Sequence, residues 1–201
     1  MLVQGIKSRP VYQGITLDPK ARRHLVVLEA EGALALTEQV KTPGDGEIAK
    51  ADILYVAGAS KPRDHDKALA ALKPHDLWTA PTVPVLLNRL HVVLGQTKMG
   101  TRIYISGTEG FIGQAMQVAL NHGVDFNSIS TEHRGSEARR VQCVHCKGIT
   151  EEVKTSPFTC SHCGLALLVR DHYSRRLGAF QGVNIDAEEP GSAPAPEVLF
   201  P

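Results

Sequence analysis

No cysteine precedes Cys143 in this 201-residue chain, so its first two thirds offer no disulfide and no thiol chemistry. Long apolar runs are missing as well, because none approaches the roughly 18 residues that a membrane span needs. Residues 1–10 lack the apolar core of a secretory signal. Together these absences predict a cytoplasmic protein that makes no membrane contact and whose cysteines stay reduced.

An excess of one charge is also missing, since 22 Lys and Arg residues stand against 21 Asp and Glu residues. Residues 138–182 are mildly basic and residues 183–201 are acidic. Neither segment is charged strongly enough to indicate nucleic acid binding by itself.

Motifs of catalysis are absent too, because the sequence has no Walker phosphate loop and no nucleophile motif. Asp64-His65-Asp66 contains acid–base groups, but it opens a predicted surface helix, where acidic residues interact favourably with the helix dipole. We therefore predict no catalytic residue in this chain.

What is present is an alternation of strand and helix patterns. Apolar runs predict strands at residues 24–30, 52–57, 102–106 and 127–131. Helical spacing predicts helices at residues 32–40, 64–73, 84–95 and 109–122, the last capped by Gly123. Residues 77–84 are predicted to be extended, because residues before proline avoid the helical region. The alternation indicates an α/β fold with a parallel sheet.

The predicted organisation has four parts. It consists of an N-terminal extension (1–20), an α/β domain (21–136), a cysteine module (137–182) and an extended or disordered acidic tail (183–201). Residues 134–140 are polar and are interpreted as a hinge between the two domains. The apolar end of the tail, Val198-Leu199-Phe200, favours a docking element and a frayed end about equally.

All four cysteines form two Cys-x-x-Cys pairs: Cys143 with Cys146, and Cys160 with Cys163. A two-residue gap lets one tight turn present two thiolates to one ion, and two such turns complete a tetrahedron. The spacing predicts one structural zinc ion per chain in a zinc-ribbon module. Rubredoxin-type iron is the alternative metal.

Histidine and arginine residues surround these cysteines. A ligand exchange with His145, His162 or His172 is conceivable, but four cysteines already satisfy a zinc ion. The stretch from Arg170 to Arg176 interleaves basic and aromatic residues, which favours a protein interface over a nucleic acid site.

Residues 102–135, RIYISGTEGFIGQAMQVALNHGVDFNSISTEHRG, resemble the last β-α-β unit of the ferredoxin-reductase-type nicotinamide-binding domain. In that family a strand ends in a Cys-Gly-Pro-x-x-Phe/Met turn; here the turn is Ser106-Gly107-Thr108-Glu109-Gly110-Phe111. The resemblance covers about residues 20–135 and implies a Rossmann-like parallel sheet. It makes Ser106, Gly107 and Thr108 weak candidates for cofactor binding.

The departures from that family concern the cofactor. Its first turn is rich in glycine, because backbone amides must approach a pyrophosphate at a helix N-terminus. The matching stretch here, Glu29-Ala30-Glu31-Gly32-Ala33, has one glycine and two carboxylates that would repel phosphate. Ser106 stands where the family has a cysteine beside the nicotinamide. We therefore expect a degenerate domain that keeps the fold and has lost dinucleotide binding.

The whole chain is similar to the DmmA-type subunits of dimethylamine monooxygenase. The most specific stretches are RRVQCVHCKG (139–148), SPFTCSHCGLALLVRDHYSRRL (156–177) and FQGVNIDAEEPG (180–191). The resemblance implies a bacterial hetero-oligomer that uses NADPH and dioxygen to convert dimethylamine to methylamine and formaldehyde. Haem, flavin and iron–sulfur groups are then expected on partner subunits only, which leaves this chain an accessory role.

Two other functions remain open at this point. One is a stand-alone NAD(P)H-dependent reductase component, against which the glycine-poor turn argues. The other is a nucleic-acid-binding zinc ribbon, against which the near-neutral N-terminal domain and the acidic tail argue.

Overall fold

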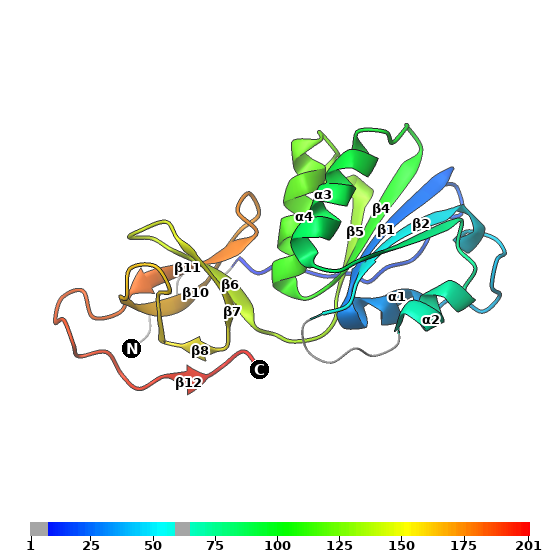
Figure 1. Cartoon of the computed structure of the whole chain (residues 1–201). Helices are drawn as coiled ribbons and strands as arrows, with labels where there is room; N and C mark the ends of the chain where they lie inside the picture. The colour runs from blue at the N-terminus through cyan, green and yellow to red at the C-terminus, as the bar shows by residue number, and fades with distance from the viewer. Residues whose placement is uncertain (1–7, 59–64) are drawn as a thin grey trace. The chain divides into compact units, whose positions relative to one another are not determined.

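The computed structural model describes residues 8–58 and 65–201, which form two compact units (Figure 1). One unit comprises Tyr12–Gly135; the other comprises Ser136–Pro201 together with the N-terminal segment that ends at Val11. No helix within the described ranges is long and apolar enough to cross a membrane.

The N-terminal unit is built on a five-stranded, wholly parallel sheet in the order β3-β2-β1-β4-β5. The strands are β1 (Arg23–Glu29), β2 (Ala51–Val56), β3 (Asp76–Ala80), β4 (Thr101–Gly107) and β5 (Ile129–His133). The helices are α1 (Leu34–Thr37), α2 (His65–Ala71), α3 (Val83–Leu94) and α4 (Glu109–Asn121), with 3-10 turns at Ala30–Ala33, Ile48–Lys50 and Phe126–Ser128. The predicted Rossmann-like α/β class is confirmed.

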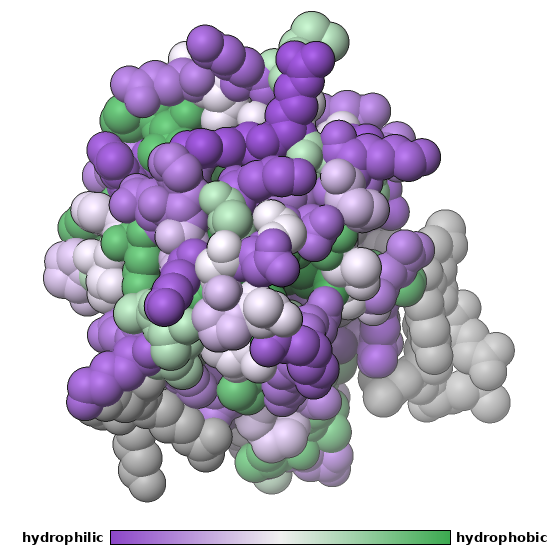
Figure 2. Space-filling view, turned by 90° about the vertical axis from the view of Figure 1, so that its right-hand side faces the viewer, coloured by the Kyte–Doolittle hydropathy of each residue, from purple (hydrophilic) through white to green (hydrophobic). Residues whose placement is uncertain are grey.

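Helices cover both faces of this sheet, as Figure 1 shows. Alternate residues of β1 point to opposite faces, so Leu25 and Val27 pack with α3 and α4, whereas Val26 and Leu28 pack with α1 and α2. The face shown in Figure 2 is mainly hydrophilic, and its apolar residues form small separate patches. The apolar residues of this unit therefore serve mainly to hold the two helical layers on the sheet.

Three predicted elements differ from the structure. The strand expected at 127–131 is β5, which begins two residues later, after the 3-10 turn Phe126–Ser128. The helix expected at residues 32–40 is a 3-10 turn followed by the short α1, because the chain first runs tightly against β4: a Cβ on Gly32 would lie 2.2 Å from the Ser106 carbonyl oxygen. The extended segment expected at 77–84 ends earlier, because Pro84 lies in the first turn of α3, where proline is favoured. The helix expected at 64–73 is α2, and Asp64 lies outside the described residues.

The C-terminal unit is a small β structure. Its main sheet has the order β7-β6-β11-β10-β9, and β12 pairs with β8. The strands are β6 (Arg139–Cys143), β7 (Ile149–Val153), β8 (Thr155–Ser156), β9 (Phe158–Thr159), β10 (Ala166–Ser174), β11 (Ala179–Asn184) and β12 (Glu197–Val198). Its apolar core contains Val141, Leu167 and Phe180 together with the buried Cys143 and Cys160. The thiols are therefore part of the core that holds this unit together.

Both ends of the described chain attach to this C-terminal unit. Ser8 forms a parallel bridge with His172 of β10, and residues from Tyr12 onward belong to the other unit, so the expected extension 1–20 is divided between the two. In the tail, β12 pairs with β8, and Phe200 is 8% exposed within the unit's own core. The idea that the apolar end docks a partner is wrong for Phe200, whereas Val198 and Leu199 are exposed.

Candidate metal centre and candidate cofactor crevice

The four cysteine sulfur atoms converge on one point. Cys143 ends β6, Cys146 lies in the next turn, Cys160 follows β9, and Cys163 precedes β10. All four Sγ atoms lie within 4.8 Å of one another, and the Cys143–Cys163 and Cys146–Cys160 Sγ pairs are each 3.8 Å apart. A tetrahedron with metal–sulfur bonds of about 2.3 Å has edges of about 3.8 Å. The thiols are thus spaced as a tetrathiolate zinc or iron site requires.

The first pair sits on a tight turn closed by backbone hydrogen bonds. The Cys143 N–H donates to the Gly148 carbonyl at 2.9 Å, and the Lys147 N–H donates to the Cys143 carbonyl at 3.0 Å. Lys147 has a φ of 63°, in the left-handed region that side-chain-bearing residues seldom adopt. In addition, the Gly148 N–H donates to Cys146 Sγ at 3.4 Å, and an amide pointed at a thiolate stabilises its negative charge.

The second pair repeats the same turn. The Cys160 N–H donates to the Leu165 carbonyl at 2.9 Å, and the Gly164 N–H donates to the Cys160 carbonyl at 3.0 Å. Gly164, with a φ of 75°, takes the place that Lys147 has in the first turn. The sequence repeat Cys-x-His-Cys is therefore also a structural repeat. We call the turns 143–148 and 160–165 the first and second knuckles.

The pKa values of Cys160 and Cys163 are shifted in opposite directions. Burial alone would raise the pKa of Cys160, but hydrogen bonds from the Cys163 and His162 amides and from neighbouring thiols bring it to about 6. At Cys163 the Leu165 amide lowers the pKa, yet burial and hydrogen bonds to neighbouring sulfurs bring it to about 12. One thiolate therefore forms readily and the last one with difficulty, as expected for four sulfurs that a divalent cation would neutralise.

The neighbouring histidines take other positions. Among the described residues, the metal-ligand cluster consists of the four cysteines and includes no histidine. His162 places Nε2 2.8 Å from the Ile149 carbonyl oxygen, His145 is exposed, and His172 lies in β10. The described structure thus gives no support for a histidine in place of a cysteine ligand.

The basic stretch after the second knuckle, from Arg170 to Arg176, contains both an internal ion pair and an exposed turn. Asp171 is bound internally, because its carboxylate lies 3.0 Å from the Arg139 guanidinium and 2.6 Å from that of Arg9. Arg175 and Arg176 lie in the exposed turn that joins β10 to β11. Arg170 and His172 are exposed as well, and a protein interface over this stretch stays a prediction.

In the N-terminal unit, a ligand of this fold would bind where the strand order reverses, between the carboxyl ends of β1 and β4. That position holds the side chain of Glu29. Its Oε2 accepts hydrogen bonds from the Thr108 N–H at 3.0 Å and from the Thr108 hydroxyl at 2.6 Å. Thr108 is the N-cap of α4, so Glu29 already supplies the negative charge that this helix N-terminus favours.

The weak cofactor candidates are consecutive residues at and just after the end of β4, and two of them approach Glu29. Ser106 is fully buried, with its Oγ unbonded among the described atoms, and Gly107 leaves no room for a Cβ, which would lie 2.8 Å from Glu29 Cβ. Thr108 is the residue that binds Glu29. The structure therefore places Gly107 and Thr108 against a carboxylate of the chain itself, with Ser106 buried beside them in β4.

Further contacts at this edge of the sheet were not predicted from the sequence. The Tyr12 hydroxyl donates to Glu109 at 2.9 Å, and Glu132 accepts a hydrogen bond from the Ile15 N–H at 2.8 Å. Arg134 also donates to Glu132, at 2.6 Å. The partners of Tyr12 and Ile15 are far apart from them in the sequence, so no local motif marks these two contacts.

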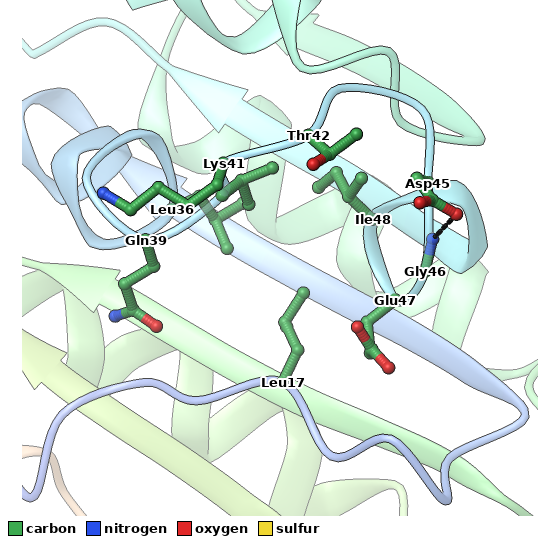
Figure 3. A pocket seen from close by; sticks show the side chains of 10 residues that line it. Leu17, Leu36, Gln39, Lys41, Thr42, Asp45, Gly46, Glu47 and Ile48 are labelled. Carbon is green, nitrogen blue, oxygen red and sulfur yellow. Dashed lines mark hydrogen bonds between the residues drawn. The ribbon is translucent and has the colours of Figure 1, made fainter.

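A separate cavity of about 380 Å³ opens on the α1 side of the sheet (Figure 3). Leu17, Leu36 and Ile48 supply apolar walls, and Lys41 and Glu47 are among the polar residues of its rim. It contains none of the thiols and none of the predicted cofactor candidates.

Comparison with known proteins gives two family matches and one close relative. Residues 4–129 match the N-terminal domain, and residues 140–183 the C-terminal domain, of the family described as dimethylamine monooxygenase subunit DmmA-like. The delta subunit of a heme-dependent oxidative N-demethylase from Ectopseudomonas mendocina (strain ymp) is 33% identical over 183 residues, which cover 91% of each chain.

Solved structures resemble the chain more distantly. An intact type IV self-sufficient cytochrome P450 monooxygenase is 19% identical, with a TM-score of 0.45 over 68% of this chain and 19% of that chain. Phthalate dioxygenase reductase is 14% identical, with a TM-score of 0.44 over 69% of this chain and 46% of that chain. The two domain matches and the full-length relative together show that the chain belongs to the DmmA-like family of dimethylamine monooxygenase subunits.

Proposed function

We propose that this chain is a non-catalytic subunit of a complex that oxidatively demethylates dimethylamine. In the overall reaction, dimethylamine, NADPH, one proton and dioxygen yield methylamine, formaldehyde, NADP⁺ and water. The family membership and the relative named as a delta subunit support a place in such a hetero-oligomer. The observation that carries the accessory role is the Glu29 carboxylate, which binds Thr108 at the point where the strand order reverses and where folds of this kind bind dinucleotides.

The redox groups are then carried by haem-containing and flavin/iron–sulfur partner subunits. This chain has four cysteines, and all of them lie in the knuckle cluster. We assign to that cluster one zinc ion, bound by Cys143, Cys146, Cys160 and Cys163. Zinc with four protein ligands has no open position for substrate, so its contribution is to hold the fold. Reduced thiols of this kind suit the cytoplasm, where we place the complex.

The isolated chain should not bind NADPH with useful affinity. Glu29 would have to leave the Thr108 amide and hydroxyl before a phosphate could bind there, and Glu31 would add a second negative charge to the same turn. Isothermal titration calorimetry should detect no binding at micromolar protein, with a ferredoxin-reductase-type protein as positive control. Micromolar affinity, which corresponds to about 8 kcal/mol, would contradict the accessory role. So would NADPH-dependent reduction of an electron acceptor by this chain alone.

Reconstitution of the complex tests the function directly. The partner subunits should form formaldehyde from dimethylamine at a substantial rate only when this chain is added. Arg175→Glu combined with Arg176→Glu should weaken assembly, because charge reversal in an exposed turn opposes docking on an acidic partner surface. Size-exclusion chromatography and NADPH consumption are the measurements. Full turnover by the partners without this chain would show that the subunit is dispensable.

A further inference from the structure

The two knuckles share the pattern Cys-x-His-Cys, but their histidines lie in different surroundings. Both histidine side chains are exposed, so the difference lies in what they contact. His162 of the second knuckle reaches across to the first, where its Nε2 lies 2.8 Å from the carbonyl oxygen of Ile149. Ile149 begins β7, directly after the first knuckle, so this contact links the two halves of the metal cluster.

The ring of His162 also lies directly over Gly148. A Cβ added to Gly148 would come within 2.4 Å of ring atoms Cγ and Cδ2 of His162, so glycine is needed to let the ring approach. Gly148 is the residue whose N–H donates to Cys146 Sγ at 3.4 Å. The ring therefore covers the backbone that stabilises the sulfur of a half-buried cysteine.

The residue before His162 also joins the second knuckle to β7. Ser161 Oγ lies 2.9 Å from Thr150 Oγ1, and the Ser161 N–H donates to Thr150 Oγ1 at 3.3 Å. Consecutive residues of the second knuckle thus bind consecutive residues of β7. The first knuckle's histidine occupies the equivalent sequence position without the same cross-contact.

We infer that His162 is a positioning residue that clamps the second knuckle over the first and slows the loss of the metal ion. The inference rests on the metal site proposed above. A bound ion leaves a tetrathiolate site when a sulfur becomes accessible to protons or to a competing ligand. The His162 ring lies against Gly148, whose N–H donates to Cys146 Sγ, and the hydrogen bond from the ring to Ile149 keeps it there. Outer-shell groups that orient metal ligands typically change metal affinity by about 10- to 100-fold.

Zinc release from the full-length, zinc-loaded chain tests this role. Release to the chromogenic chelator 4-(2-pyridylazo)resorcinol should be at least about tenfold faster for His162→Ala than for the wild type. The matched control His145→Ala, at the equivalent position of the other knuckle, should stay within about twofold of the wild type. His162→Phe keeps a ring, and His162→Gln keeps a hydrogen-bond donor, so both should release zinc at intermediate rates. Equal release rates for His162→Ala and His145→Ala would overturn the inference.

Folding and metal content are measured in parallel. If His162→Ala does not fold with zinc, the release rates of His162→Phe and His162→Gln test the inference instead. Zinc release faster than that of His145→Ala by either variant supports it. If neither variant releases zinc faster than His145→Ala, the inference is overturned. Failure of the wild-type chain to bind any metal would instead remove the metal site itself. That result is visible by elemental analysis before any release rate is measured, so the two failures are distinguishable.

Discussion

Replacing Cys160 by serine should unfold the C-terminal unit and leave the N-terminal unit folded. Cys160 is 2% exposed and belongs both to the thiol cluster and to the apolar core of this unit. A structural zinc ion contributes about 10–16 kcal/mol to the folding of a small domain, more than such a domain can lose and stay folded. The N-terminal unit has its own two cores on the faces of the parallel sheet.

Hydrogen exchange measured by mass spectrometry separates the two units. Peptides from residues 139–184 should lose protection in Cys160→Ser, while peptides from β1 and β4 should exchange as in the wild type. His145→Ser, a replacement by serine at an exposed knuckle position, is the control and should change neither unit. Elemental analysis of the wild type should give one zinc per chain. Detection of iron, with a visible thiolate–iron absorption band, would show that iron fills the site in place of zinc. Unfolding of both units together would contradict the expectation that they have separate cores.

Phe200→Ala should destabilise the C-terminal unit by about 3–5 kcal/mol, the cost of truncating a buried phenylalanine. The Phe200 ring lies 4.0 Å from the guanidinium carbon of Arg139, and the Phe180 ring lies 4.0 Å away from the same atom. Arg139 is itself 7% exposed and pairs with Asp171, so the substitution also uncovers a buried cation. An aromatic face on a desolvated guanidinium contributes about 2 kcal/mol.

Leu199→Ala is the matched control, because Leu199 is the neighbouring residue and is 51% exposed. Its replacement should cost less than about 0.5 kcal/mol, as usual for surface positions. Urea unfolding of the zinc-loaded chain, followed by hydrogen exchange in each unit, measures both variants. Similar losses for the two substitutions would show that Phe200 does not pack on Arg139 in solution.

The sequence predicted the features that rest on local patterns. Apolar runs such as HLVVLEA and RIYIS specify strands without reference to the rest of the chain, and the face Phe111, Ile112, Ala115 specifies α4. The Cys-x-x-Cys pairs specify their own turns, so the convergence of four thiols followed from spacing alone. In each case the physical cause lies within a few residues.

The features that sequence reasoning missed depend on distant partners. The tail composition predicted an extended or disordered segment, but not that Phe200 packs with Arg139 and Phe180 near the end of the chain. The carboxylates of Glu29, at the end of β1, and Glu31 predicted repulsion of phosphate, but not that Glu29 binds Thr108, 79 positions away. Nothing in a local pattern selects such a partner, because only the folded sheet brings β1 and β4 together.

The contact between Glu29 and Thr108 also bears on when this subunit is folded in the cell. A domain stabilised by a dissociable cofactor gains stability with the concentration of that cofactor, by mass action. Here the anion is tethered to the same chain, so its effective concentration is fixed and does not follow metabolite levels. If the chain binds no dinucleotide, as proposed above, the stability of the N-terminal unit should be the same when reduced nicotinamide is abundant and when it is depleted.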